Sequence, residues 1–179
     1  MALAFSHMGI FVQNIHRMSA FYTDVLGMVE TDRGMLGGIQ LVFLSADPAE
    51  HHQMVLATGR PEGLAFNVVN QISFRAESLD ELRTLFRHVE AEPDCAELIP
   101  ITHGVSWSVY FRDPEGNRIE AFVDSRFYIN QPVREPLDLM GTDDDTILAV
   151  TEQRCREEES FRPVSEWRAE MAEKLGKTT

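Results

Sequence analysis

Several apolar segments of the sequence carry polar side chains that could bind a metal ion or move a proton. His7 lies in one such segment, Gln71 begins another, and the pair His51-His52 opens a third. Glu120 stands in the middle of the apolar run IEAF. An ionised carboxylate in a buried strand is costly unless a cation or a proton neutralises it. We therefore expect Glu120 to have a cationic partner.

Together these residues offer a carboxylate, an imidazole and an amide oxygen, with a second imidazole nearby. Such a set suits a divalent first-row metal that keeps open coordination positions. A metal ion bound by His7, Gln71 and Glu120 would then be the cation that the carboxylate needs. The alternatives are structural: His7 and Gln71 could simply be hydrogen-bonded. Glu120 could instead pair with Arg75 or Arg118.

The elements that must position these residues form a predicted repeat of strand, helix and three strands. The first copy is expected at residues 5–12, 14–28 (the helix), 28–35, 39–45 and 51–57. The second is expected at 71–76, 78–92 (the helix), 97–102, 106–112 and 117–123. The first strands and helices are offset by about 64 residues, and LVFLSADP in one copy corresponds to SVYFRDP in the other. We expect a site in the cleft between the copies.

Turn and cap residues support these boundaries. Gly27 is expected to end the first helix, and Gly37-Gly38 marks a turn between two strands. Ser78 and Glu81 fit a capping box at the second helix.

The turns Asp47-Pro48 and Asp113-Pro114 align the last strands of the two copies. That alignment gives His52 the same strand parity as Glu120, so we expect both side chains to face inward.

The predicted fold class is α+β, with two βαβββ modules that pair into a curved mixed sheet around a metal cleft. The domain is expected over residues 1–124, with modules at about 4–58 and 70–124 and a C-terminal extension over 125–179. Two helices are expected in the extension, at 143–158 with Thr142 as cap and at 164–175, separated by Pro163.

Composition excludes several classes of protein. The formal net charge of −13 argues against nucleic acid and anionic membranes as partners, since both need a basic surface. Cys95 and Cys155 are too few for a disulfide framework, which favours a reducing cytoplasm. The N-terminus lacks the pattern of a signal peptide, and no apolar run approaches the ~18 residues of a membrane span.

The chain resembles the vicinal oxygen chelate superfamily, which includes glyoxalase I, fosfomycin and bleomycin resistance proteins and type I extradiol catechol dioxygenases. The stretches that carry the resemblance are SHMGIFVQNIHRMSAFYTDVLGM, VNQISFRAESLDELR and VYFRDPEGNRIEAF. They cover roughly residues 4–124. The resemblance implies a fold of paired βαβββ modules, like the repeat above.

The single-domain extradiol dioxygenases are the most similar members. Their two histidines and glutamate hold Fe(II), which implies His7, Gln71 and Glu120 as the metal ligands here. The pair His51-His52 resembles a histidine pair of the family, one member of which is the acid–base catalyst.

A further histidine and a tyrosine line the family's pocket, and His103 and Tyr110 are similar to them. Gln71 departs from the pattern, because a histidine is usual there. The amide is a weaker ligand, so Mn, Ni or Zn are alternatives to Fe(II).

The first functional hypothesis is cleavage of a catechol-like aromatic ring with O₂. His52 would take and return a proton, and Tyr110 and His103 would hydrogen-bond the substrate. Four further residues are expected to bind the substrate: His51, Phe74, Trp107 and Phe122. A homodimer or larger homo-oligomer is expected.

Two other functions remain open. A glyoxalase-like isomerase, an epimerase or a lyase could use His7, His52, Gln71 and Glu120 around Ni, Co, Zn or Mn, without oxygen. A non-catalytic small-molecule binding protein, such as a resistance protein, needs no metal. The histidine pair argues against this last function, because a sequestering pocket has no use for a proton shuttle.

Overall fold

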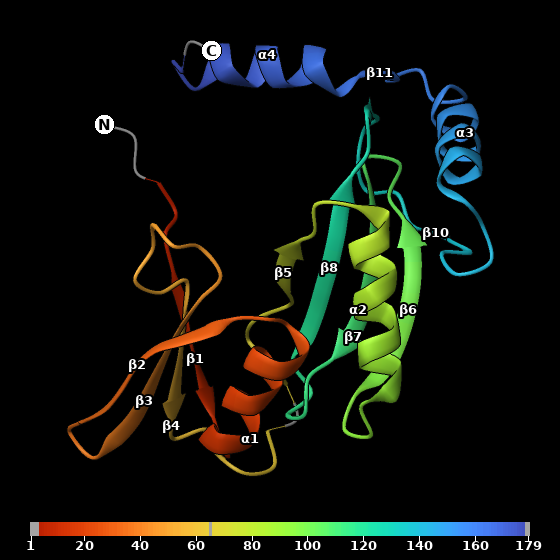
Figure 1. The fold of residues 1–179 in the computed structure, drawn as a ribbon. Coiled ribbons are helices and arrows are strands. Elements are labelled where there is room, and N and C mark those ends of the chain that lie inside the picture. Colours follow the sequence, from red (N-terminus) through yellow and green to blue (C-terminus); the bar gives the residue numbers. More distant parts are fainter. Residues whose placement is uncertain (1–3, 65, 178–179) are drawn as a thin grey trace. The chain divides into compact units, whose positions relative to one another are not determined.

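The computed structural model describes residues 4–64 and 66–177. Within these ranges the chain is mixed α+β, and its strands form two main mixed sheets, which confirms the predicted class. The chain divides into two compact units, which are described separately (Figure 1). Unit 1 comprises the described residues up to Asn70, Glu92–Ala96 and Arg112–Arg118. Unit 2 comprises Gln71–Ala91, Glu97–Phe111 and the described residues from Ile119 onward.

Unit 1 contains a four-stranded sheet. Its strands are β1 (Met8–Val12), β2 (Val29–Leu36), β3 (Ile39–Ser45) and β4 (Met54–Thr58). They lie in the order β1-β4-β3-β2, with β1 parallel to β4. Helix α1 (Ile15–Ala20) contacts β3 and β4 and continues into the π-helical segment η1 (Phe21–Val25). Val12, Met18, Tyr22, Leu44 and Leu56 are fully buried.

The predicted turns of unit 1 are confirmed. Gly27 has a φ of 70° and donates its N–H to the Thr23 carbonyl, so it ends the helical segment. Gly37 and Gly38 have φ values of 58° and 86° between β2 and β3. This left-handed pair matches the twist of a two-residue hairpin.

Unit 2 repeats the topology of unit 1. Its sheet contains β5 (Ile72–Arg75), β6 (Ala96–Thr102), β7 (Ser106–Arg112), β8 (Arg118–Asp124) and β10 (Glu135–Pro136). The order is β10-β6-β7-β8-β5, with β5 parallel to β8, so the first and last strands of each module pair in the same way. The predicted repeat of βαβββ is therefore confirmed.

Helix α2 (Leu79–Ala91) begins at the predicted cap. The Ser78 hydroxyl accepts the Glu81 N–H at 3.2 Å, and the Glu81 carboxylate accepts the N–H of Glu77 at 2.8 Å. The carboxylate therefore reaches one residue further back than in the usual capping box, where it bonds the cap residue itself.

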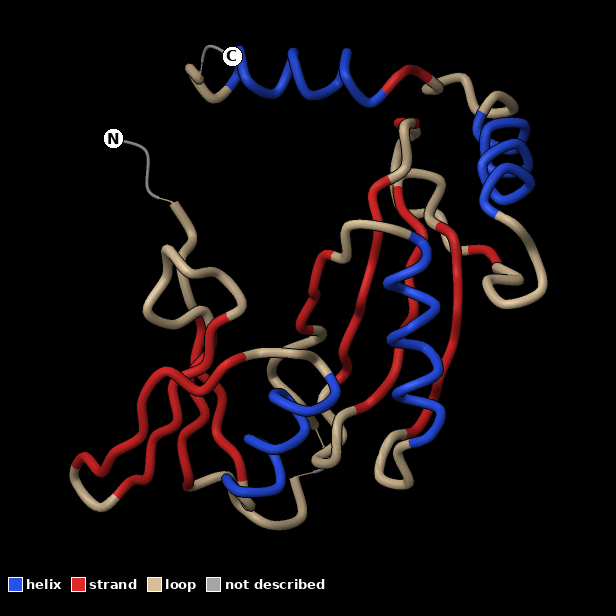
Figure 2. The backbone as a smooth tube through the Cα atoms, in the orientation of Figure 1, coloured by secondary structure: helices blue, strands red, loops and turns tan. Residues whose placement is uncertain are grey.

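The extension contains two helices and a small strand pair (Figure 2). These elements are β9 (Phe127–Tyr128), α3 (Asp144–Cys155), β11 (Arg162–Pro163) and α4 (Val164–Lys174). Asp143 caps α3 by accepting the Thr146 N–H at 2.9 Å, so the prediction of Thr142 as cap is wrong by one residue. A carboxylate also suits the positive end of the helix dipole better than a hydroxyl does.

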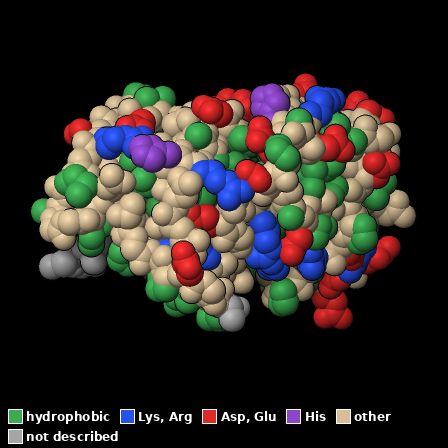
Figure 3. Space-filling model, turned by 90° about the horizontal axis from the view of Figure 1, so that it is seen from below, with side chains coloured by type: hydrophobic (Ala, Val, Ile, Leu, Met, Phe, Trp, Pro, Cys, Tyr) green, Lys and Arg blue, Asp and Glu red, His purple; other side chains and the backbone are tan. Residues whose placement is uncertain are grey.

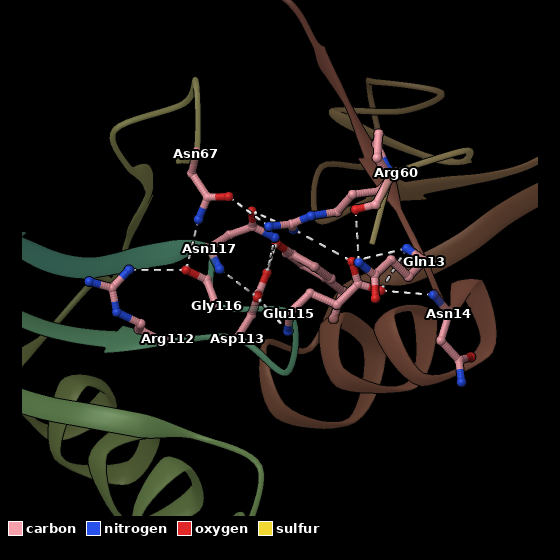
Figure 4. A network of polar contacts seen from close by, with 11 residues as sticks. Gln13, Asn14, Arg60, Asn67, Arg112, Asp113, Glu115, Gly116 and Asn117 are labelled. Carbon is pink, nitrogen blue, oxygen red and sulfur yellow. Dashed lines mark hydrogen bonds and ion pairs between the residues drawn. The ribbon is translucent and has the colours of Figure 1, made fainter. Parts of the chain in front are cut away.

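The turn between β7 and β8 is anchored by a buried ion pair within unit 1 (Figure 4). The Glu115 carboxylate accepts the backbone N–H groups of Gln13 and Asn14 at 2.8 Å each. Arg60 Nη1 lies 3.5 Å from the same carboxylate, and the two side chains are only 8% and 7% exposed. Arg60 also donates to Asn117 at 3.0 Å, so one arginine joins the turn to the end of β4.

Charge is spread over the surface. Figure 3 shows acidic side chains at many points of one face with basic ones among them, in keeping with the formal net charge of −13. Among the helices of the described residues, none is long and apolar enough to cross a bilayer.

Candidate metal and proton-transfer site

The Glu120 carboxylate is the centre of a polar cluster inside unit 2. It lies on β8 and is 7% exposed. Oε1 accepts from the hydroxyls of Ser108 at 2.9 Å and Tyr110 at 2.7 Å. Oε2 accepts from the Ser73 hydroxyl at 2.7 Å and the Gln71 amide nitrogen at 2.8 Å. Four hydrogen bonds to one carboxylate strongly favour its ionised form.

Strand geometry brings these donors together. Ser73 is directly opposite Glu120 in the parallel pairing of β5 with β8, and Gln71 lies on the same face two positions earlier. Ser108 and Tyr110 are likewise two positions apart on β7, so their side chains share one face of that strand. The sequence analysis missed Ser73 and Ser108, although their spacing of two from Gln71 and Tyr110 was a signal that could have identified them.

His103 is placed to supply a positive charge beside Glu120 when its imidazole is protonated. Its Nδ1 donates to the carbonyl of Val133, and its Nε2 lies 3.1 Å from the Tyr110 oxygen and 3.6 Å from Glu120 Oε1. Because the Tyr110 proton is already directed at Glu120, Nε2 interacts favourably only when it carries a proton itself. The arrangement therefore favours an imidazolium beside a carboxylate.

Electrostatics within the cluster agree with this assignment. The nearby Glu120 carboxylate, 3.6 Å from Nε2, raises the pKa of His103 in spite of the partial burial of the imidazole. Burial tends to raise the pKa of Glu120, but the nearby His103 and the hydrogen bonds from Ser73, Tyr110 and Ser108 outweigh it and lower that pKa to about 2. Glu120 is thus ionised throughout the physiological range.

The alternative pairing of Glu120 with Arg75 is wrong. Arg75 instead forms an ion pair with Asp124, and its guanidinium lies 4.7 Å from the centre of the Phe122 ring. Phe122 has the same strand parity as Glu120, so the predicted wall residue Phe122 lies on the face of the cluster.

Two other predicted wall residues face away from Glu120. Trp107 is on the opposite face of β7 from Tyr110, and its Nε1 donates to Thr151 of α3 at 2.8 Å. Phe74 pairs with Ala121 rather than with Glu120, which places it on the opposite face of β5. We therefore remove Trp107 and Phe74 from the expected substrate wall.

The remaining candidates, His7, His51 and His52, gather in unit 1. The ring centres of His7 and His52 lie 4.4 Å apart, and the Nδ1 atoms of His51 and His52 lie 2.9 Å apart. Phe43 meets the His52 ring edge-on at 5.2 Å. Burial, followed by the neighbouring His7 and His51, lowers the pKa of His52, which favours a neutral imidazole.

These histidines lie just outside the strands in which they were predicted. His7 precedes β1, and His51 and His52 precede β4, so the argument from strand parity does not place His52. The reason is a loop closed by Gln53, whose side chain accepts the Ala46 N–H at 2.9 Å and whose own N–H donates to Leu44 at 2.9 Å.

The donor chemistry fits a divalent metal. A carboxylate binds a metal in its deprotonated form, and the lowered pKa of Glu120 favours that form. The Gln71 amide nitrogen is directed at Glu120, which leaves the amide oxygen as the atom for a metal.

Within the described part of the chain, no three or more His, Cys, Asp or Glu side chains are arranged to hold a metal ion. The predicted metal ligands include one amide, that of Gln71. His7 belongs to unit 1, and Gln71 and Glu120 belong to unit 2.

The imidazolium of His103 gives a testable pH dependence. Folding raises the pKa of His103 above its value in the unfolded chain, which is near 6.5. The protonated histidine therefore contributes its full stabilisation below pH ~6.5, and this contribution is lost as the pH rises through the pKa of the folded state. We expect the unfolding free energy of metal-free protein to fall over that window. His103→Gln should lower stability at pH 6 and abolish the fall. Urea titrations at several pH values measure both, and an unchanged fall in the variant would exclude His103 as its cause.

The chain belongs to the Glyoxalase/Bleomycin resistance protein/Dioxygenase superfamily, whose model matches residues 4–121. Among individual relatives, biphenyl-2,3-diol 1,2-dioxygenase 3 of Rhodococcus globerulus is 27% identical over 125 residues. The aligned part is 67% of this chain and 63% of that protein, so the chain spans less than two thirds of its relative's length.

Solved structures show the same fold. A glyoxylase/bleomycin resistance protein/dioxygenase domain from Frankia sp. EAN1pec has a TM-score of 0.57 at 20% identity, covering 69% of this chain and 99% of that one. A mutant of the fosfomycin resistance protein FosX from Listeria monocytogenes, in complex with Mn(II) and 1S,2S-dihydroxypropylphosphonic acid, has a TM-score of 0.54 at 19% identity. It covers 68% of this chain and 92% of that one.

Proposed function

We propose that the protein is a metal-dependent extradiol dioxygenase, which cleaves the ring of a catechol-like aromatic with O₂. The observation that carries this proposal is the Glu120 cluster, where an ionised carboxylate lies beside two proton donors, Tyr110 and His103. The similarity to a diol dioxygenase of Rhodococcus globerulus supports the same reaction class.

His7, Gln71 and Glu120 would hold the metal, with Fe(II) as the expected ion. When bound, the metal would act as a Lewis acid that binds the two adjacent oxygens of a catechol and lowers their pKa. The carboxylate suits this role because its charge is already established before any ion arrives.

The other residues would move and hold protons. A neutral His52 can accept a proton from a substrate hydroxyl and return it later. Tyr110 and His103, when it is protonated, could redirect their hydrogen bonds from the Glu120 cluster to an oxygen that gains negative charge. Phe122 offers an apolar ring on the same face as Glu120, and His51 supports the His52 imidazole through their 2.9 Å contact.

Gln71 should limit the affinity for iron. Imidazole suits Fe(II) better than a neutral amide oxygen does, so we expect Gln71→His to bind Fe(II) about tenfold more tightly. Anaerobic titration with Fe(II) measures this change. Gln40→His is the control, because Gln40 is an exposed glutamine on β3 in unit 1. Equal affinity of the Gln71→His variant and the original protein would mean that position 71 does not contact the metal.

Oxygen uptake tests the reaction class. Protein reconstituted with Fe(II) should consume O₂ in the presence of catechol or biphenyl-2,3-diol. It should not do so with resorcinol, whose hydroxyls are not adjacent and cannot bind one metal together. Reconstitution with Ni(II) or Zn(II) should give no uptake. If none of the diols supports oxygen uptake in iron-loaded protein, the dioxygenase proposal is wrong and a redox-neutral isomerase replaces it.

A further inference from the structure

A second cavity lies in unit 2, among residues that the proposed reaction does not use. It has a volume of about 240 Å³, is partly open to solvent, and is lined by the end of β6, the segment that follows β9, and α3. Of its lining residues, Thr102 and Gly104 alone fall within the part of the chain matched to the superfamily. The cavity therefore belongs mainly to the C-terminal extension.

The walls of this cavity, which we call the α3 cavity, are firmly held. Ile129 and Cys155 are fully buried beside Gly104, and a side chain at Gly104 would lie 2.6 Å from an Ile129 methyl group. Thr151 accepts a hydrogen bond from the buried Trp107 at 2.8 Å. Arg83 donates to the carbonyl of Thr142 at 3.0 Å and so ties the segment before α3 to α2. The inner wall of the cavity is thus well packed, whereas Asp138, Thr146 and Val150 on its outer side are exposed.

The lining is apolar with a few hydroxyl groups. Aliphatic side chains come from Ile129, Val133, Leu137, Ile147 and Val150, and hydroxyls from Thr102, Thr142, Thr146 and Thr151. Such a surface suits a small apolar molecule that is oriented by one or two hydrogen bonds. An apolar cavity of about 150 Å³ is known to hold benzene, so the α3 cavity has room for a substituted single ring.

Charge in the lining disfavours an anion. Arg154 is the one basic residue among the lining residues that the structure describes, and it is paired with Glu135 at 2.7 Å and Glu158 at 2.8 Å. Asp138 adds a further negative charge to the wall. A carboxylate or phosphate would therefore find no unpaired cation there, whereas a neutral molecule would keep these ion pairs intact.

We propose that the C-terminal extension builds a second small-molecule site, the α3 cavity, for a neutral compound with one ring and one hydroxyl or carbonyl group. This site goes beyond the proposed dioxygenase function and does not depend on it. Val133 lines the cavity and its carbonyl accepts a hydrogen bond from His103. An occupant therefore contacts the residue that orients His103 in the Glu120 cluster.

Fluorescence of Trp107 provides a direct test. The chain has two tryptophans, so Trp167→Phe leaves Trp107 as the sole tryptophan fluorophore. Trp107 donates a hydrogen bond to the cavity residue Thr151. Metal-free protein is titrated with benzyl alcohol, which lacks adjacent oxygens and cannot bind a metal as a catechol would. We expect a saturable change in fluorescence. Benzoate, which has the same ring and a negative charge, should bind at least about tenfold more weakly.

Two variants locate the binding. Val150→Phe places a ring at the partly exposed rim of the cavity and should weaken benzyl alcohol binding about tenfold or more. Ala149→Phe is the matched control, because Ala149 is the exposed neighbour on α3 and does not line the cavity. Its affinity should equal that of the parent protein.

A second measurement needs no variant at position 150. Methyl NMR signals of Val133 and Ile147 should shift with benzyl alcohol along the same saturation curve as the fluorescence. The proposal is overturned if neither the Trp107 fluorescence nor the methyl NMR shifts saturate with benzyl alcohol. It is also overturned if Val150→Phe binds as tightly as Ala149→Phe, or if benzoate binds as tightly as benzyl alcohol.

Discussion

His52→Phe is expected to retain bound metal and to lower kcat about 10²- to 10⁴-fold, the usual contribution of a positioned acid–base group. The reason is the neutral state of His52, which its burial and the neighbouring His7 and His51 favour. Phenylalanine keeps an aromatic ring beside Phe43 but cannot carry a proton. Steady-state oxygen uptake with catechol, together with the iron content of the same sample, measures both parts of this expectation.

His88→Phe is the matched control for this variant. His88 is an exposed histidine on α2, so its replacement should leave kcat and iron content unchanged. Turnover retained in His52→Phe would remove His52 from the mechanism. Loss of iron together with turnover would make His52 a metal ligand, as in the four-group site that a glyoxalase-like enzyme would use.

Arg60→Met is expected to lower the unfolding free energy by about 3–5 kcal/mol, the usual cost of breaking a buried ion pair from one side. The variant leaves the buried Glu115 carboxylate with its two backbone donors but without a cation. It also removes the donors to Asn67 and Asn117, which hold the β7–β8 turn in unit 1. Urea unfolding of metal-free protein measures the loss.

Arg17→Met is the control for this prediction. Arg17 pairs with Asp94 at 2.7 Å, but the two side chains are 42% and 51% exposed. Exposed pairs contribute at most about 1 kcal/mol, so the control should unfold almost like the original protein. Equal losses in the two variants would show that burial of the Arg60–Glu115 pair does not determine its contribution.

The repeat was predictable because its signals are local. Helical spacing of apolar residues, the Gly37-Gly38 turn and the Ser78 cap each depend on neighbouring residues, and the structure confirms all three. The predicted strand boundaries differ from the observed ones by a few residues where residues predicted in a strand belong to a loop. His52 is the main case, since Gln53 closes the loop before β4 begins.

The partners of Glu120 were only partly predictable from single segments. Ser73 meets Glu120 through the register of β5 on β8, and Ser108 does so from β7, so each contact joins residues far apart in the chain. The role of His103 depends on the Val133 carbonyl of the extension, where no sequence motif was recognised. Sequence reasoning identified the carboxylate and predicted a cationic partner, but the position of His103 beside Glu120 came from the structure.

The proposed metal site is tested most directly by the metal content of the protein and of Glu120→Gln, both purified without oxygen or chelator. Mass spectrometry of each sample gives the bound metal per chain. The account predicts close to one Fe(II) per chain in the original protein, before or after reconstitution, and its loss in Glu120→Gln. A protein that contains no metal and takes up none of Fe(II), Mn(II), Ni(II) or Zn(II) would contradict the account, as would a Glu120→Gln variant with unchanged iron.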